Sequence, residues 1–231
     1  MSTFADHVIQ FNLSLDFKGK LPPGIQIMNP FREQGAIADV MQQFYKKFYN
    51  DHRTRRMILG INPGRLGSGS TGVPFSDTKR LADECGIHIT GFKTHEPSSV
   101  FVYDVIHAYG GVQPFYQDFY IGSVCPLGFT ADAANGKVVN YNYYDSKALT
   151  TAVYELIVTS IRRQLQFGID RKVGYCMGTG KNAAFLQALN EKEGFFEQVI
   201  PLEHPRFVMQ YKAKSKQEYV DKYLAAFEDH K

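Results

Sequence analysis

The sequence predicts an α/β fold in which helices cover both faces of a mostly parallel sheet. Four short apolar runs are typical of buried strands, and they lie at residues 56–61, 119–125, 172–177 and 198–202. Between them, apolar residues recur at three- and four-residue steps, which is the spacing of helices with one buried face. Strands that alternate with helices along a chain form parallel sheets with helices on both sides.

The helices of this fold can be placed from their apolar spacing. Residues 35–50 and 145–167 give clear patterns, and Asp145 is expected to cap the second of these helices. A helix near the C-terminal end should begin with a capping box formed by Ser215 and Glu218. Shorter helices are expected at residues 3–15, 99–109 and 181–190.

Length and composition favour one globular domain spanning residues 1–231. The chain is 44% hydrophobic and 21% charged, without repeats or flexible linkers, so it has ample material for one core. Its net charge of +3 is too small to identify a nucleic-acid partner. The three cysteines are widely spaced and form no CxxC pair, which argues against disulfides or a zinc site and suits a reducing compartment.

Targeting and membrane segments are not expected. The N-terminus lacks a basic leader followed by an apolar run. No stretch approaches the roughly 18 apolar residues that a membrane span needs. We therefore expect a soluble cytoplasmic protein that makes no contact with a membrane.

The loops that follow the four strands are the candidate site, because ligands of parallel sheets bind at the carboxyl ends of the strands. The first loop, residues 62–75, begins with Asn62 and contains four glycines, which let backbone approach a ligand closely. No Gly-Lys-Ser/Thr follows, which argues against a nucleotide phosphate loop. From the glycines alone, a surface turn without a ligand is an equally good interpretation. Asn62 at the strand end and Phe75 in the same loop favour a site.

The loop after the fourth strand carries His204 at the strand end, then Pro205 and the basic–aromatic pair of Arg206 and Phe207. A single histidine is more often structural than catalytic, but its place at a strand terminus favours a role in the site. Three lysines follow, which are interpreted either as a solvated surface or as phosphate contacts: Lys212, Lys214 and Lys216.

The remaining two loops are less specific. The third strand leads through Gly178 into a helix near Lys181, where free N–H groups and a positive side chain favour phosphate binding. An ordinary turn capped by Thr179 is an equally good interpretation. The second strand ends near Ser123 and Cys125, and Cys125 is interpreted as a small buried residue rather than a nucleophile.

Taken together, the loops resemble those of the uracil-DNA glycosylase superfamily. The likeness is greatest to its single-strand-selective monofunctional branch, and within it to the bacterial second subfamily. Any one motif is unspecific, but five occur in the family's order and approximate spacing: Gly60-Ile61-Asn62-Pro63-Gly64, Thr71-Gly72-Val73-Pro74-Phe75, Cys125-Pro126-Leu127, Gly178-Thr179-Gly180-Lys181 and His204-Pro205. The resemblance implies a three-layer α/β/α sandwich around a central four-stranded parallel sheet.

The resemblance also implies roles for individual residues. Asn62 would hold the attacking water, and His204 would stabilise the negative charge that develops on the departing base. Phe75 would stack on a base flipped out of the DNA, while the backbone of Ile61 and Gly64 would line the pocket.

Contacts with DNA are expected around this pocket. Arg65, Gly178 and Lys181 would contact the DNA, with basic side chains on its phosphates. The loop carrying Arg206 and Phe207 would enter the space that the flipped base leaves.

Two departures from the family pattern bear on specificity. Ser123 stands where the animal branch carries an asparagine that reads the uracil edge, so strict selection for uracil is not expected. The family's longer His-Pro-Ser-Pro wedge is here the shorter His204-Pro205-Arg206, which leaves the mode of duplex invasion open.

The sequence therefore favours a monofunctional DNA glycosylase of base excision repair, without a metal or cofactor, that acts on DNA as a monomer. Uracil is the expected target, with xanthine as a further candidate. No lysine replaces Asn62, so neither a Schiff base nor strand cleavage is expected. One alternative is a lesion-binding module with negligible turnover, against which Asn62 and His204 argue. Another is a nucleotide-binding α/β protein, against which the absence of a phosphate-loop motif argues.

Overall fold

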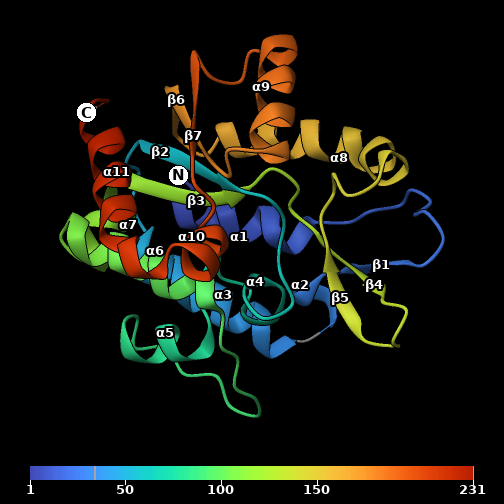
Figure 1. The fold of residues 1–231 in the computed structure, drawn as a ribbon. Helices are drawn as coiled ribbons and strands as arrows, with labels where there is room; N and C mark the ends of the chain where they lie inside the picture. Colours follow the sequence, from blue (N-terminus) through green and yellow to red (C-terminus); the bar gives the residue numbers. More distant parts are fainter. Residues whose placement is uncertain (34, 231) are drawn as a thin grey trace.

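The structure, a computed structural model, describes residues 1–33 and 35–230. Its centre is a sheet of four parallel strands, ordered β3-β2-β6-β7 (Figure 1). These are β2 (Arg55–Gly60), β3 (Phe119–Ser123), β6 (Ile169–Met177) and β7 (Gln198–Leu202). All four predicted strands are confirmed, although β3 ends two residues before Cys125.

The predicted helices are present, together with several shorter ones. The predicted set comprises α1 (Phe4–Ser14), α3 (Gly35–Phe48), α6 (Pro97–Tyr109), α8 (Lys147–Leu165), α9 (Lys181–Glu193) and α11 (Lys216–Glu228). The others span too few residues for an apolar spacing to show in the sequence. They are α2 (Pro30–Glu33), α4 (Ser68–Thr71), α5 (Thr78–Asp83), α7 (Val112–Asp118), α10 (Pro205–Tyr211) and the 3₁₀ turn η1 (Ala213–Ser215).

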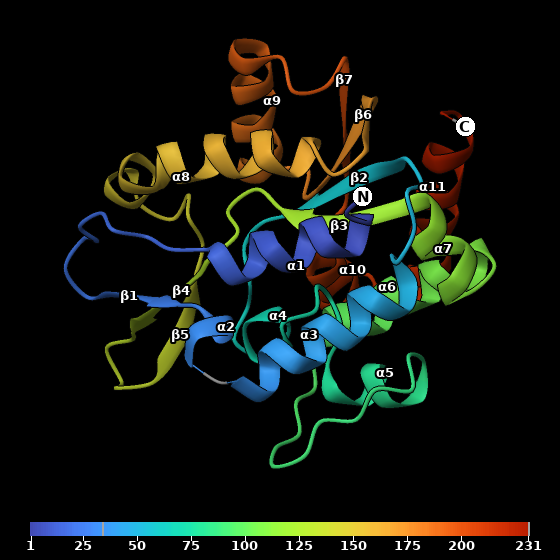
Figure 2. The same ribbon diagram turned by 180° about the vertical axis from the view of Figure 1, so that it is seen from behind.

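Successive aromatic residues of β3 point to opposite faces of the central sheet and pack against helices there. Phe119 packs against Phe227 of α11, with 4.3 Å between ring centroids. The next residue, Tyr120, packs on the opposite face against Phe4 of α1, with 5.4 Å between ring centroids. The helices thus lie in two layers around the sheet, which confirms the predicted three-layer sandwich (Figures 1 and 2).

A second, antiparallel sheet was not predicted. It consists of β1 (Ile25–Met28), β4 (Gly128–Asp132) and β5 (Val138–Tyr141), in the order β1-β4-β5. It stands apart from the central sheet, beyond α2 (Figure 1). Strand β5 is solvent-exposed along most of its length, so no buried apolar run marked it in the sequence.

The cap of α8 is Ser146 rather than Asp145, so that prediction was wrong. The Ser146 hydroxyl accepts the backbone N–H of Leu149 over 3.2 Å. Asp145 precedes the capping position, and its carboxylate instead accepts the N–H of Asn142 over 2.7 Å. This bond stabilises the turn that leads from β5 into α8.

The predicted capping box of α11 and the alternative cap by Thr179 do not form in the described part of the chain. Ser215 precedes α11, but η1 leaves its φ and ψ at −110° and 24°, away from the extended geometry that a capping box needs. Helix α9 begins after Gly180, so Thr179 is not in the capping position.

The three cysteines are free and buried. Burial raises the pKa of Cys125 to about 12, and burial raises that of Cys176 to about 12 as well. These thiols are therefore neutral at physiological pH, as expected of small buried residues. Among the described residues, no helix is long and apolar enough to cross a membrane.

Candidate active site

The four strand-end loops meet at one cleft of about 680 Å³. Each central strand contributes a lining residue from its carboxyl end: Asn62 after β2, Ser123 from β3, Gly178 after β6 and His204 after β7. The loops predicted to form one site thus lie around one cleft. Parallel strands produce this arrangement because all their carboxyl ends lie at the same edge of the sheet.

The carboxamide of Asn62 is fixed by backbone groups at the end of β5 and just after it. Its Oδ1 accepts the N–H of Tyr143 over 3.1 Å, and its Nδ2 donates to the carbonyl of Tyr141 over 3.3 Å. Because one partner can only donate and the other only accept, these bonds fix which end of the amide carries the oxygen. An amide oxygen has two lone pairs, and only one of them accepts a bond from Tyr143. Asn62 lines the cleft and is only partly buried, so the second lone pair is accessible to a further donor.

Tyr143 connects Asn62 to the start of α9. Its side chain is fully buried, and its hydroxyl donates to Oδ1 of Asn182 over 2.8 Å. The Nδ2 of Asn182 in turn donates to the carbonyl of Met177, at the end of β6, over 3.1 Å. Tyr143 and Asn182 therefore link Asn62 by hydrogen bonds to the carboxyl end of the neighbouring strand β6.

The glycine loop folds tightly on itself. The carbonyl of Gly64 accepts N–H groups from Gly67 and Gly69, over 3.1 Å and 2.9 Å. A Cβ atom on Gly69 would lie 2.8 Å from that same carbonyl oxygen, so a side chain there would disrupt the turn. Ile61 and Gly64, which were expected to line a base pocket, both line the cleft.

Phe75 adopts a left-handed backbone conformation, with φ at +50°, and is the one non-glycine residue of the described chain to do so. Such a conformation is strained for an aromatic residue and persists where its surroundings enforce it. Thr71 provides part of that constraint, since its hydroxyl donates to the carbonyl of Ser76 over 2.7 Å. The Phe75 ring packs over Gly60, where a Cβ would lie 3.2 Å from the ring, and its centroid lies 6.1 Å from that of His204.

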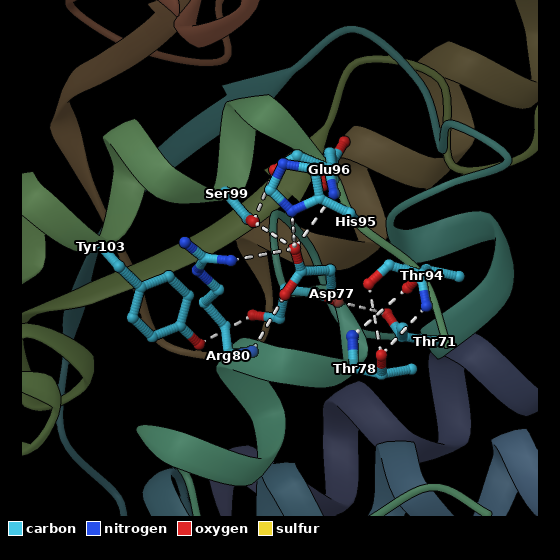
Figure 3. A network of polar contacts seen from close by, with 10 residues as sticks. Thr71, Asp77, Thr78, Arg80, Thr94, His95, Glu96, Ser99 and Tyr103 are labelled. Atoms are coloured by element: carbon cyan, nitrogen blue, oxygen red, sulfur yellow. Dashed lines mark hydrogen bonds and ion pairs between the residues drawn. The ribbon is translucent and has the colours of Figure 1, made fainter. Parts of the chain in front are cut away.

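A buried aspartate anchors the chain beyond this loop, as Figure 3 shows. Asp77 is fully buried, and its carboxylate caps α5 by accepting the N–H of Arg80 over 2.9 Å. The same carboxylate accepts the N–H of Glu96 and the hydroxyl of Ser99, each over 3.0 Å. These bonds fix the start of α6 and place the side chain of Glu96 at the cleft.

Glu96 is the acidic residue that lines the cleft. Its Oε2 atom is buried and has no hydrogen-bond partner among the described residues. Burial, and secondarily the negative charge of Asp77, raise the pKa of Glu96 to about 7. The carboxyl packs against Gly67, where a Cβ would lie 2.3 Å from Oε2.

His204 occupies the N-cap position of α10. Its Nδ1 accepts the backbone N–H of Arg206 over 3.1 Å, so the proton of the neutral ring is on Nε2. Burial, and secondarily the positive charge of Arg206, lower the pKa of His204 to about 4. At neutral pH the ring is therefore an uncharged hydrogen-bond donor at Nε2.

Ser123 lies opposite Gly60 in the register of β3 and β2. It is partly exposed and lines the cleft. Its hydroxyl has no hydrogen-bond partner within residues 1–33 and 35–230, so it is free to donate to or accept from a ligand.

The residues expected to contact DNA fall into two groups. Gly178, Lys181, Arg206 and Phe207 all line the cleft. Arg65 does not, and its backbone N–H instead binds Oδ1 of Asn140 over 3.0 Å while the residue is exposed to solvent.

The segment with Arg206 and Phe207 was predicted as a loop, and that prediction was wrong. Both residues lie in the first turn of α10, which Pro205 begins. Proline suits a first helical position because it needs no hydrogen bond from its nitrogen, and the ring of His204 caps the same turn. This segment is therefore a helix end rather than an irregular loop.

Several lining residues were not identified from the sequence. Asn140, Asn142 and Tyr144 come from β5 and the turn after it, and Glu96 from the start of α6. None of these segments follows a central strand, so the rule that located the other loops did not apply to them. Within the described chain, no cluster of three or more His, Cys, Asp or Glu side chains could hold a metal ion.

Comparisons with known proteins agree with the fold. The family model of the Uracil DNA glycosylase superfamily matches residues 46–228. A search of curated protein sequences finds no significant match. Among solved structures, the crystal structure of wild-type SMUG2 from Pedobacter heparinus is similar, with a TM-score of 0.97 and 57% sequence identity. The likeness covers 99% of this chain and 98% of that one.

Proposed function

The chain belongs to the uracil-DNA glycosylase superfamily, as its five motifs predicted, and from this premise we propose that it is a monofunctional glycosylase that hydrolyses the N-glycosidic bond of uracil in DNA. The observation that supports this most directly is a pair of polar groups in one cleft. One is the fixed carboxamide of Asn62, and the other is the neutral ring of His204.

Asn62 positions the attacking water in this proposal. Its Oδ1 has one lone pair occupied by Tyr143 N–H and one available for a water O–H. An amide oxygen is a weak base, so it orients water rather than deprotonating it. The reaction therefore depends on stabilising the departing base, and the water adds to C1′ as the bond to the base nitrogen breaks.

His204 stabilises that departing base. The electron pair of the broken bond moves onto the base, and negative charge develops on its carbonyl oxygens. The Nε2–H of His204 donates to such an oxygen without first needing a proton from solvent, since its pKa is near 4. Removing one donor of this kind typically lowers the rate by about 10²–10³-fold.

Phe75 and Ser123 hold the base that is cleaved. A base inside a duplex must rotate out to reach the cleft, and stacking on an aromatic ring offsets part of that cost, by about 1–3 kcal/mol. Phe75 supplies the ring, and the free hydroxyl of Ser123 contacts the base edge. A single hydroxyl that rotates accepts more than one edge, so we include xanthine as a second substrate.

DNA is held at the rim by Arg65, Gly178, Lys181, Arg206 and Phe207. The two cations that line the cleft, Lys181 and Arg206, contact phosphates. Arg65 lies outside the cleft and contacts the DNA farther from the flipped base. The cleft is complete within one chain, so we expect the enzyme to act as a monomer.

The proposal is tested with oligonucleotides that carry one uracil or one xanthine, incubated with the protein in EDTA. We expect free base to be released and strand breaks to appear only after alkali treatment. Asn62 is not a lysine, so no borohydride-trapped protein–DNA adduct is expected. Absence of base release would contradict the proposal, and strand breaks without alkali would contradict its monofunctional part.

A further inference from the structure

Two aromatic side chains form an exposed pair on α10. Phe207 is 41% exposed and Tyr211 is 66% exposed, and they are the exposed large aromatic side chains of the described residues. They lie four positions apart on the helix, with ring centroids 5.6 Å apart and planes inclined at 45°. Exposed aromatic rings that pack mainly on one another leave an apolar surface open to a planar ligand.

This pair lies on the wall of the cleft. Both residues line it together with His204, which begins the turn that Phe207 continues. The opposite side of α10 is buried through Pro205 and Val208, so the rings are held on a packed helix. The base-stacking ring proposed above, Phe75, is only partly exposed and packs over Gly60, whereas this pair is open to solvent.

Three unpaired positive side chains lie next to the pair in sequence or in the same cleft. Arg206 and Lys212 flank it along the chain, and Lys181 lines the same cleft. All three are exposed, and none forms an ion pair within the described part of the chain. An aromatic surface bordered by free cations matches a nucleotide, which presents a flat base next to a negative phosphate.

We propose that Phe207 and Tyr211 form a second base-binding site, which stacks an unpaired nucleobase next to the nucleotide that is cleaved. This proposal rests on the proposed DNA substrate and adds a subsite to it. Stacking on the pair recognises the face of the base rather than its edge, so the site accepts any of the four bases.

The site favours single-stranded over double-stranded substrate. In a duplex, both faces of the neighbouring base are covered by stacking, and that base must leave the helix before it can bind here. In a single strand the same base is already available. The pair therefore contributes more to binding a single strand than to binding the corresponding duplex.

The test uses fluorescence anisotropy with two labelled oligonucleotides, one with a non-hydrolysable 2′-fluoro-deoxyuridine and one of the same sequence without it. Each is measured single-stranded and as a duplex. The variants are Tyr211→Ala and Phe207→Ala, with Tyr211→Phe as the conservative change. Tyr219→Ala is the matched control, because Tyr219 is a partly buried tyrosine of α11 that does not line the cleft.

We expect Tyr211→Ala and Phe207→Ala to weaken single-strand binding by about 5- to 150-fold, the range for loss of one base-stacking partner. Duplex binding should weaken less. Tyr211→Phe should bind like wild type, because it keeps the ring, and so should Tyr219→Ala. Because Tyr211 is 66% exposed, its variants should keep the melting temperature of the wild type.

A 2-aminopurine placed beside the fluorinated uridine reports on stacking directly. Its fluorescence should fall when wild type or Tyr211→Phe binds and change less with Tyr211→Ala. Single-strand affinity of Tyr211→Ala equal to wild type would overturn the proposal. So would an equal loss on the duplex, or oligomers of the wild type that Tyr211→Ala dissociates while leaving DNA binding intact.

The two proposals fail in different ways. If the protein releases uracil but Tyr211→Ala binds single strands normally, the second base site is wrong and the glycosylase function stands. If the protein binds single strands through Tyr211 but releases no base, the proposed activity is wrong and the site stands.

Discussion

The backbone N–H of Tyr143 donates to Oδ1 of Asn62 over 3.1 Å, across 81 positions of sequence. The tyrosine thereby fixes the orientation of the amide at the end of β2, while its own hydroxyl binds Asn182 at the start of α9. The turn after β5 is thus part of the support for the proposed water-binding residue. Placement of this kind matters because small misplacements of a reacting group reduce rates strongly.

The tautomer of His204 is a first prediction. We expect its Nε2 to carry the proton at pH 7, because Nδ1 accepts the N–H of Arg206. Long-range ¹H–¹⁵N correlation spectra of ¹⁵N-histidine-labelled protein would show this directly. His204→Ala should lower the single-turnover rate by about 10²-fold or more. A lower melting temperature with unchanged activity per folded molecule would instead make His204 a structural residue.

The same histidine should make stability depend on pH. Its pKa is lowered to about 4 in the folded protein, from 6.5 in the unfolded chain. The unfolded state then takes up a proton before the folded state does, so stability falls as pH drops from about 6.5 to 4. Denaturant unfolding across this window should show a shallower decline in His204→Asn. An identical decline in both proteins would refute the lowered pKa.

Glu96 should make the folding stability depend on pH in the opposite direction to His204. Its pKa is raised from 4.5 to about 7, so the stability it contributes is present below pH 4.5 and is lost as pH rises to 7. Glu96→Gln should therefore raise the melting temperature relative to wild type at pH 8 and change it less at pH 5. It should also tighten DNA binding at pH 8, since it removes a negative charge from the cleft.

Glu191→Gln is the matched control for that experiment, because Glu191 is an exposed residue of α9 outside the cleft. It removes the same charge. Its effects on the melting temperature and on DNA affinity should not differ between pH 5 and pH 8 as those of Glu96→Gln do. If Glu96→Gln behaved like Glu191→Gln at both pH values, Glu96 would not be a buried carboxyl of the cleft.

DNA affinity should weaken steeply with salt. Removing one cation that binds a phosphate should reduce the slope of log Kd against log salt by about 1. We therefore expect Lys181→Gln and Arg206→Gln each to lower this slope, as measured by anisotropy between low and physiological salt. Both residues line the cleft. A salt-independent affinity in the wild type would point to a small-molecule ligand instead of DNA.

Ser123 should influence which base is removed. Ser123→Asn would place a donor and an acceptor at the position where the cleft now has one free hydroxyl. We expect the ratio of uracil to xanthine cleavage to rise in this variant. The ratio is measured as single-turnover rates on matched oligonucleotides. A wild type without xanthine activity, or an unchanged ratio, would show that Ser123 does not read the base.

The sequence predicted the parts of the site that follow central strands. Buried apolar runs located β2 and β7, and so the strand ends that carry Asn62 and His204. The hairpin that supports Asn62 was missed because the exposed strand β5 has no buried run. The bonds from Tyr141 and Tyr143 to Asn62 join residues that are far apart in sequence. The sequence likewise did not show that Glu96 lines the cleft, because its position depends on the hydrogen bond from its backbone N–H to the carboxylate of Asp77.

Local signals were less reliable than the pattern of strands. Asp145 and Ser146 are both good capping residues, and which one caps α8 depends on the turn that precedes it. The segment with Arg206 and Phe207 is too short for a helical repeat to show, and its conformation follows from Pro205 and the cap by His204.

Asn62 positions the attacking water in the proposed reaction, and this role is tested by comparing the rate and the DNA affinity of Asn62→Ala. A water-positioning group acts mainly in the transition state, so its loss should affect the chemical step far more than binding. We expect the single-turnover rate of uracil release to fall by about 10²-fold or more. The affinity for the 2′-fluoro-deoxyuridine oligonucleotide should stay within a few-fold of wild type. A single-turnover rate within about threefold of wild type would show that Asn62 does not position the attacking water.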